Sequence, residues 1–361
     1  MKHFSQPSGH SSTRLILLAS VAAILLTACG QKAPEVSGGG TVATRDSGGK
    51  SSPASGAGQN PCSLLEPKEV EAVLGSTLAG PPYRFNKTGK AGPAPDGDAC
   101  RYETAGYHFI EIEVEWKGGA QMMKLYGTVQ NLADQKMKGV LKLGDGSELT
   151  GEWDEARVVN CCTFIAMRGD QVVTVDIAGS NATLEQAARI ADAALKRIEK
   201  PLPVDATAGI AAAIARDATR PQERNPCSLV SRAEAEAALE APLTKDPEVD
   251  GSTCLYTCAG KFPRTIGLAI SWRNGYAQLR EHTAIAAGVG KAFALGGDAG
   301  QDKKESPAPD PLLTGPWESA QRVQDKFLAV KKDVLITAGS VMARRDVELA
   351  RNLVALAIGK L

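Results

Sequence analysis

Asn60-Pro-Cys-Ser-Leu64 occurs a second time as Asn225-Pro-Cys-Ser-Leu229, and this repeated pentapeptide organises the rest of the chain. Similar segments follow both copies in the same order: Cys100-Arg-Tyr102 corresponds to Cys254-Leu-Tyr256, Ile110–Trp116 to Ile266–Trp272, and Gly151–Ala156 to Gly315–Ala320. The repeated unit, which begins at Asn60 and again at Asn225, is long enough to be a whole domain, because solenoid repeats span only about 20–50 residues. We therefore predict two tandem homologous domains, residues 60–199 and 225–361, joined by a linker at residues 200–224.

Each domain is predicted to be α+β, with a small antiparallel sheet packed with helices in the order α-β-β-α-β-β-β-α. In the first domain, helices are expected at residues 67–74, 120–138 and 184–198, and strands at 100–103, 109–116, 163–168 and 172–178. Equivalent patterns recur in the second domain, with helices near residues 276–287 and 347–358. A short helix is expected within the linker at residues 208–218, and an insertion at residues 296–315 is expected to be a loop.

The first 28 residues are typical of a lipoprotein signal peptide. The apolar run Leu15–Ala28 follows Lys2 and Arg14, and its 14 residues are too few for a membrane-spanning helix, which needs about 20. The run leads into Cys29 through Leu26-Thr-Ala, which resembles the bacterial lipobox and predicts a lipidated Cys29. An ordinary secretory signal with a nearby cysteine is the alternative. Residues 29–59 are rich in Gly, Ser and Pro, so they are predicted to form a disordered tether.

A lipid on Cys29 would anchor the protein to a membrane of the cell envelope. In Gram-negative bacteria, Asp after the lipidated cysteine favours retention in the inner membrane. Gly30 occupies this position and therefore predicts the outer membrane, facing the periplasm, if the cell is Gram-negative. The surface of a Gram-positive or actinobacterial cell is the alternative.

Charge and histidine content disfavour several classes of function. The chain has 41 Lys and Arg against 41 Asp and Glu, so it lacks the positive charge typical of nucleic-acid-binding proteins. Only His108 and His282 follow the signal peptide, and they do not correspond between the domains. No metal site, cofactor or histidine-based catalytic triad is expected.

Seven cysteines follow Cys29. The matched positions predict the disulfides Cys62–Cys100 and Cys227–Cys254, because exported proteins keep such pairs oxidised. Cys161, Cys162 and Cys258 have no counterparts in the other domain. Two pairings remain open for them: a bond from Cys258 to Cys161 or Cys162, which would cross-link the domains, and a bond between the adjacent Cys161 and Cys162.

Two sets of side chains are candidates for chemistry or binding. Glu111, Glu113 and Glu115 lie on one face of a predicted strand, where they are expected to be solvated. The alternative is that they serve in acid–base catalysis in a hydrolase. The tryptophans form two matched pairs, which are Trp116 with Trp272 and Trp153 with Trp317. Core packing is the simpler interpretation, and a ligand pocket walled by aromatic rings is the alternative.

The segment Asn60-Pro-Cys-Ser-Leu-Leu65, with Ala72-Val-Leu-Gly75, a Cys-x-Tyr and a strand that ends in Trp, resembles the DUF3558-type lipoprotein domain. This resemblance covers both predicted domains and is most specific at their starts. It implies a cell-envelope lipoprotein with paired cysteines and without established catalytic residues.

These observations predict a membrane-anchored, non-catalytic module that binds or scaffolds an envelope protein, lipid or glycan. One alternative is a cell-wall or envelope hydrolase that uses strand carboxylates. The other is a structural spacer between membrane and wall.

Overall fold

The computed structural model describes residues 59–87, 92–136, 148–205, 207–260, 264–294, 310–340 and 347–361, without the side chains of residues 129–136 and 287–294. The predicted signal peptide, Cys29 and nearly all of the predicted tether lie outside the described residues, as does most of the predicted loop at 296–315. Both predicted domains belong to one compact unit. No helix in the described ranges is long and apolar enough to cross a membrane.

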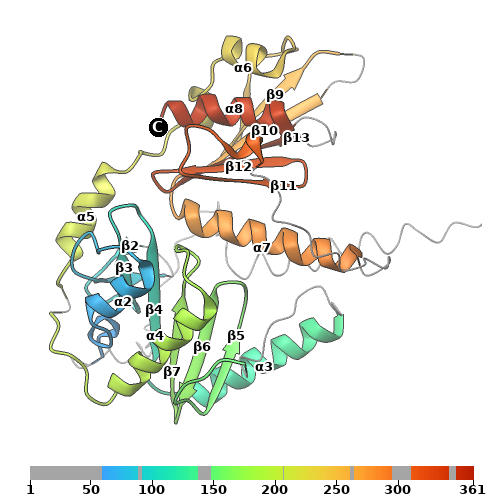
Figure 1. The fold of residues 1–361 in the computed structure, drawn as a ribbon. Helices are drawn as coiled ribbons and strands as arrows, with labels where there is room; N and C mark the ends of the chain where they lie inside the picture. The colour runs from blue at the N-terminus through green and yellow to red at the C-terminus, as the bar shows by residue number, and fades with distance from the viewer. Residues whose placement is uncertain are drawn as a thin grey trace, which may run out of the picture. The chain divides into compact units, whose positions relative to one another are not determined.

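The chain is α+β, with one antiparallel sheet in each domain, as the sequence predicts. The first domain contains η1 (Pro61–Ser63), α2 (Pro67–Leu74), β1 (Tyr83–Asn86), β2 (Gly92–Pro93), β3 (Ala99–Glu103), β4 (Phe109–Glu115), α3 (Gly119–Lys136), β5 (Glu155–Val158), β6 (Thr163–Arg168), β7 (Gln171–Asp176) and α4 (Leu184–Arg197). The linker contains α5 (Ile210–Thr219), close to its predicted place. Figure 1 shows the elements by label.

The second domain repeats this order with small differences. It contains η2 (Pro226–Ser228), α6 (Arg232–Leu239), β8 (Glu248–Asp250), β9 (Thr253–Cys258), β10 (Arg264–Ser271), α7 (Gly275–Ala294), η3 (Pro311–Leu313), β11 (Ser319–Val323), β12 (Lys326–Lys331), β13 (Val334–Ser340) and α8 (Val347–Gly359).

The two sheets have corresponding strand orders. The first runs β2-β1-β3-β4-β7-β6-β5, and the second, read in the same direction, runs β8-β9-β10-β13-β12-β11. Sequence patterns missed β1, β2 and β8, which extend the sheets at the edge next to β3 and β9. These strands are only two to four residues long, so they carry too little alternation to be recognised without their pairing partners.

The repeated pentapeptide builds the same local structure twice. Asn60 accepts a hydrogen bond from the backbone N–H of Cys62, and Asn225 accepts one from Cys227 (3.0 and 2.8 Å). Pro stands at the first position of each short 3₁₀ helix, where its missing N–H costs nothing. The cysteine is thereby presented to the neighbouring strand.

The main core of each domain lies between its sheet and its last helix. In the first domain, α4 packs across β6 and β7, and in the second, α8 packs across β12 and β13 (Figure 1). Ile110, Ile112 and Val114 of β4 point into the first core. Glu111 and Glu113 alternate with them and therefore lie on the opposite face of the sheet.

Candidate functional site

The two predicted disulfides are confirmed. Cys62 bonds Cys100 and Cys227 bonds Cys254, with a Cα–Cα distance of 5.0 Å in each case. Each bond joins the 3₁₀ helix to the strand that carries the Cys-x-Tyr sequence. Tyr102 and Tyr256 reinforce this join, because their hydroxyl groups donate to backbone carbonyls just after the 3₁₀ helix, namely those of Leu65 and Val230.

Of the two pairings that remained open, the cross-link between the domains is excluded. Cys161 bonds its neighbour Cys162, and Cys258 is a free, fully buried thiol. Cys162 belongs to the core of the first domain and Cys258 to the core of the second. Thiols buried in two separate cores cannot meet, and this decides between the two pairings that the sequence left open.

The four tryptophans pack against the cores. Trp116 and Trp153 contact the first core, and Trp272 and Trp317 contact the second. Trp153 lies 5.4 Å from the Phe164 ring, measured between ring centroids, and Trp317 lies 5.0 Å from the equivalent Phe327. None of the four lines either of the two cavities described below. The structure favours core packing over an aromatic ligand pocket.

The prediction of a solvated glutamate face is wrong for Glu111. Its side chain is only 6% exposed, whereas that of Glu113 is 36% exposed and Glu115 is exposed. Strand register explains the burial, because Tyr83, Arg101, Glu111 and Asp176 stand side by side across β1, β3, β4 and β7. The sequence interpretation considered β4 alone and missed these neighbours.

Arg101 is the centre of this row. Its Nε donates to Glu111 over 2.8 Å, and its guanidinium carbon lies 4.1 Å from the ring centroids of both Phe85 and Phe109. A guanidinium between two aromatic faces is stabilised by cation–π attraction while it forms the ion pair. Lys87 adds a second positive charge, 3.5 Å from a carboxylate oxygen of Glu111 and of Glu113.

The carboxylates on this face differ in their pKa. Burial raises the pKa of Glu111, but the charges of Arg101 and Lys87 outweigh burial and the net shift is downward. Burial is the largest effect on Glu113 and Asp176 and leaves the pKa of both raised, although Lys87 acts in the opposite direction. Glu111 is therefore held as a carboxylate, whereas Glu113 and Asp176 retain protons more readily.

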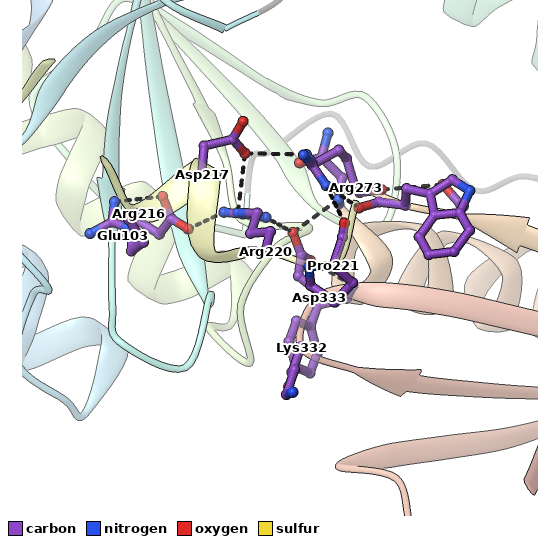
Figure 2. A network of polar contacts seen from close by, with 12 residues as sticks. Glu103, Arg216, Asp217, Arg220, Pro221, Arg273, Lys332 and Asp333 are labelled. Carbon is purple, nitrogen blue, oxygen red and sulfur yellow. Dashed lines mark hydrogen bonds and ion pairs between the residues drawn. The ribbon is translucent and has the colours of Figure 1, made fainter. Parts of the chain in front are cut away.

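A second ion network joins the first domain, the linker and the second domain (Figure 2). Arg220 donates to Glu103 on one side and to Asp333 on the other, and Arg216 donates to Glu103 over 2.8 Å. Glu103, Arg220 and Asp333 have side chains at most 5% exposed. Because buried charges are tolerated only when they are paired, this network holds the linker against both domains.

Further contacts connect the same regions. Arg101 donates to Asn274 over 3.4 Å, and Asn274 donates its backbone N–H to Asp333 over 3.0 Å.

Arg280 of α7 donates to the carbonyls of Ile177, Ser180 and Ala182 in the first domain. The ring of His108 contacts that of Tyr276, with 4.2 Å between centroids and a tilt of 43°, while His282 is exposed. Sequence analysis missed all these contacts. The only sequence signal for them was the alternation of the charged Arg101 and Glu103, which point outward, with the inward Cys100 and Tyr102.

An open, mostly apolar cavity of about 450 Å³ lies beside the first disulfide. Its wall includes Cys62 and Glu71, and it is otherwise made of aliphatic residues, one glycine and prolines, among them Leu65, Leu78, Pro81, Pro82, Leu202 and Val204. Cavities of about 300–1,000 Å³ with mainly apolar walls are the usual form of small-molecule sites. This cavity is the candidate functional site.

The linker supplies one wall of the cavity. The Leu202 N–H donates to the Ser63 carbonyl over 2.8 Å, and Asn60 donates to the Val204 carbonyl over 3.5 Å. Gly209 adopts φ +78°, and a Cβ there would lie 2.4 Å from the Pro81 carbonyl oxygen, so only glycine permits this close approach. The linker is thus seated on the segment that forms the opposite wall.

A smaller cavity of about 150 Å³ lies in the second domain. Ser271, Gln278, His282 and Thr337 are among its lining residues, and the Gln278 amide donates to the Ser271 hydroxyl over 2.6 Å. Its volume is below the usual range for ligand sites. In the described ranges, no group of three or more His, Cys, Asp or Glu is arranged to hold a metal ion.

Comparison with protein-family models, with curated proteins and with solved structures finds no match to this chain. The candidate site therefore stands on its own geometry.

Proposed function

We propose that this chain is a lipid-anchored protein of the bacterial cell envelope that binds an apolar ligand without catalysing a reaction. The observation that carries this proposal is the 450 Å³ cavity of the first domain, with its mostly apolar wall. The second domain, paired to the linker through Asp333 and Arg220, would act as a support that keeps the linker in place.

The location rests on the sequence. The lipobox-like segment before Cys29 and the resemblance to DUF3558-type lipoprotein domains support a lipid anchor in the envelope, in the outer membrane facing the periplasm if the cell is Gram-negative. A Gly-rich tether of residues 29–59 would give the folded part a reach of about 30 Å from the membrane. The protein would then meet its ligand close to the membrane surface.

Organic extraction of the protein purified from its own envelope tests the proposal. We expect mass spectrometry of the extract to find a co-purifying compound that is depleted in Leu78→Trp, which fills the cavity. Ala79→Trp is the matched control, because Ala79 is adjacent in the chain but exposed and outside the cavity wall. Equal recovery from wild type and Leu78→Trp, or recovery of no compound, would reject a binding role for this cavity.

One observation favours the hydrolase alternative. Burial raises the pKa of Glu113, as a general acid requires, and Lys87 lies 3.5 Å away. Glu111 is unsuited to that role because Arg101 and Lys87 hold it ionised. If the protein hydrolyses envelope glycans or peptides, Glu113→Gln should abolish that activity and Glu115→Gln should preserve it.

A further inference from the structure

The wall of the candidate cavity offers almost no hydrogen-bond donors. Pro67, Pro81 and Pro82 have no N–H, and they make up three of the ten lining residues. Several of the remaining N–H groups are already used. The Leu78 N–H donates to the Glu71 carboxylate over 2.9 Å, the Leu202 N–H to the Ser63 carbonyl, and the Val204 N–H to the Leu202 carbonyl. A phosphate, carboxylate or sugar ring would lose its hydrogen bonds to water on entering and would gain few in return.

Glu71 is the one charged residue in the wall. Its Oε1 accepts from Leu78, so the carboxylate stays at the cavity and adds negative charge there. An anionic head group near the opening would be repelled, whereas an uncharged head group would not. The wall therefore disfavours anionic head groups near the opening and polar groups inside the cavity.

The equivalent place in the second domain has a different side chain at one position. Glu236 accepts from the Leu243 N–H over 2.9 Å, just as Glu71 accepts from Leu78. However, Arg232 stands where the first domain has Pro67, and its guanidinium donates to the Leu243 carbonyl over 2.8 Å as well as to Glu236 and Asp246. A charged guanidinium therefore stands at this place, where the first domain presents the ring of a proline.

Resting on the proposed function, we infer that the cavity of the first domain takes a single hydrocarbon chain of a membrane lipid whose head group is uncharged and stays in solvent. A chain fits because it needs no donors and gains affinity with every methylene removed from water. That gain is about fourfold per methylene. It ends when the chain fills the cavity, so affinity should rise with chain length and then level off.

Binding of monoacylglycerols tests this inference. The mature chain from residue 29, with Cys29→Ser and produced without residues 1–28, serves as the reference protein, because without a lipid anchor or an apolar signal segment it needs no detergent, which would itself enter the cavity. Fluorescence titration with monoacylglycerols of increasing chain length, below the concentration at which they aggregate, should show about fourfold tighter binding per methylene before the plateau. Fatty acids of matched length should bind more weakly at neutral pH, and Glu71→Gln should reduce that difference.

The variants decide where the probe binds. Leu78→Trp should weaken binding at least about tenfold, Ala79→Trp should bind like the reference, and circular dichroism should show that both are folded. Val204→Trp, from the linker wall, replaces Leu78→Trp if the latter does not fold. Affinity that does not depend on chain length would overturn the inference. So would binding that neither Leu78→Trp nor Val204→Trp weakens.

The outcomes also separate the inference from the proposed function. A compound that co-purifies from the envelope and depends on Leu78, but carries no hydrocarbon chain, would overturn the ligand class and leave the binding function intact. If the reference protein binds the probe but the lipidated wild type in vesicles of anionic phospholipid, which the wall disfavours, does not, the cavity is filled by the protein's own lipid, and a lipid from the surrounding membrane is not the ligand.

Discussion

The two domains share their cores and differ on the opposite faces of their sheets. Both have a disulfide between the 3₁₀ helix and the adjacent strand, a buried tyrosine after the second cysteine, and a tryptophan packed on a phenylalanine. Arg101, Glu111 and Asp176 pair side by side in the first sheet, and Leu255, Gly267 and Gly339 occupy the equivalent positions in the second. The shared residues build the fold. The charged row across the sheet and the 450 Å³ cavity belong to the first domain and distinguish it.

The largest expected effect comes from giving the first domain a neutral residue of the second. Glu103 corresponds to Thr257, and Glu103→Thr would leave Arg216 without its buried partner and Arg220 with Asp333 as its one remaining buried partner. Removing one member of a buried ion pair costs about 3–5 kcal/mol. Urea unfolding followed by tryptophan fluorescence should show a loss of this size. Glu115→Ser, a matched exchange at an exposed site on β4, should change stability by less than about 0.5 kcal/mol. Similar midpoints for the two variants would show that the network contributes little.

The paired disulfides allow a direct comparison of the domains. Replacing Cys62 and Cys100 together by Ala, or Cys227 and Cys254 together, should each cost about 3–4 kcal/mol of unfolding free energy. The first loss should be larger by a few tenths of a kcal/mol, because its bond closes a longer loop, with a sequence separation of 38 against 27. Denaturant unfolding of both double variants measures the difference. A clearly greater loss from the second pair would mean that packing, more than chain entropy, decides the contribution.

Two carboxylates of the charged face should respond to pH with opposite signs. The pKa of Glu111 is lowered from its ordinary value of 4.5, so its charge stabilises the fold above that pH and this stabilisation is lost as the pH falls. The pKa of Asp176 is raised from 3.8, so its ionisation makes the fold less stable as the pH rises through and above that value.

The variants Glu111→Gln and Asp176→Asn isolate these contributions. The stability difference between wild type and Glu111→Gln should favour wild type at neutral pH and shrink on acidification. As the pH rises, the stability of Asp176→Asn should increase relative to that of wild type. Unfolding midpoints measured from acidic to neutral pH give both curves, and parallel curves would contradict the assigned roles.

The smallest expected effect concerns the end of the first helix in each domain. Gly75 adopts φ +67° at this position, and Glu240 adopts φ +51° at the equivalent one. The left-handed conformation costs about 1–2 kcal/mol for a residue with a side chain. Glu240→Gly should therefore stabilise the second domain by about 1 kcal/mol, and Gly75→Ala should destabilise the first by a similar amount, as measured by thermal unfolding. A destabilised Glu240→Gly would show that the exposed Glu240 side chain contributes more than this strain.

The sequence was most informative where structure is local. The helices expected at residues 67–74 and 184–198 and the strands expected at 163–168 and 172–178 depend on near neighbours, so these elements were predicted close to their observed bounds. The short strands β1, β2 and β8 could not be recognised, because their conformation depends on pairing with β3 and β9. Glu111 was placed in solvent for the same reason, since its burial depends on Arg101 and Asp176 from neighbouring strands.

The sequence by itself determined the two-domain α+β architecture and the two matched disulfides, because the repeated Asn-Pro-Cys-Ser-Leu segment, the helix and strand patterns and the paired cysteines act over short distances or at matched positions. Only the tertiary structure decided that Cys161 bonds Cys162, that Arg220 joins Glu103 to Asp333, and that Leu202 and Val204 complete a cavity beside Cys62. These features depend on which surfaces meet after the sheets have formed. A linear sequence specifies such meetings only through the whole fold.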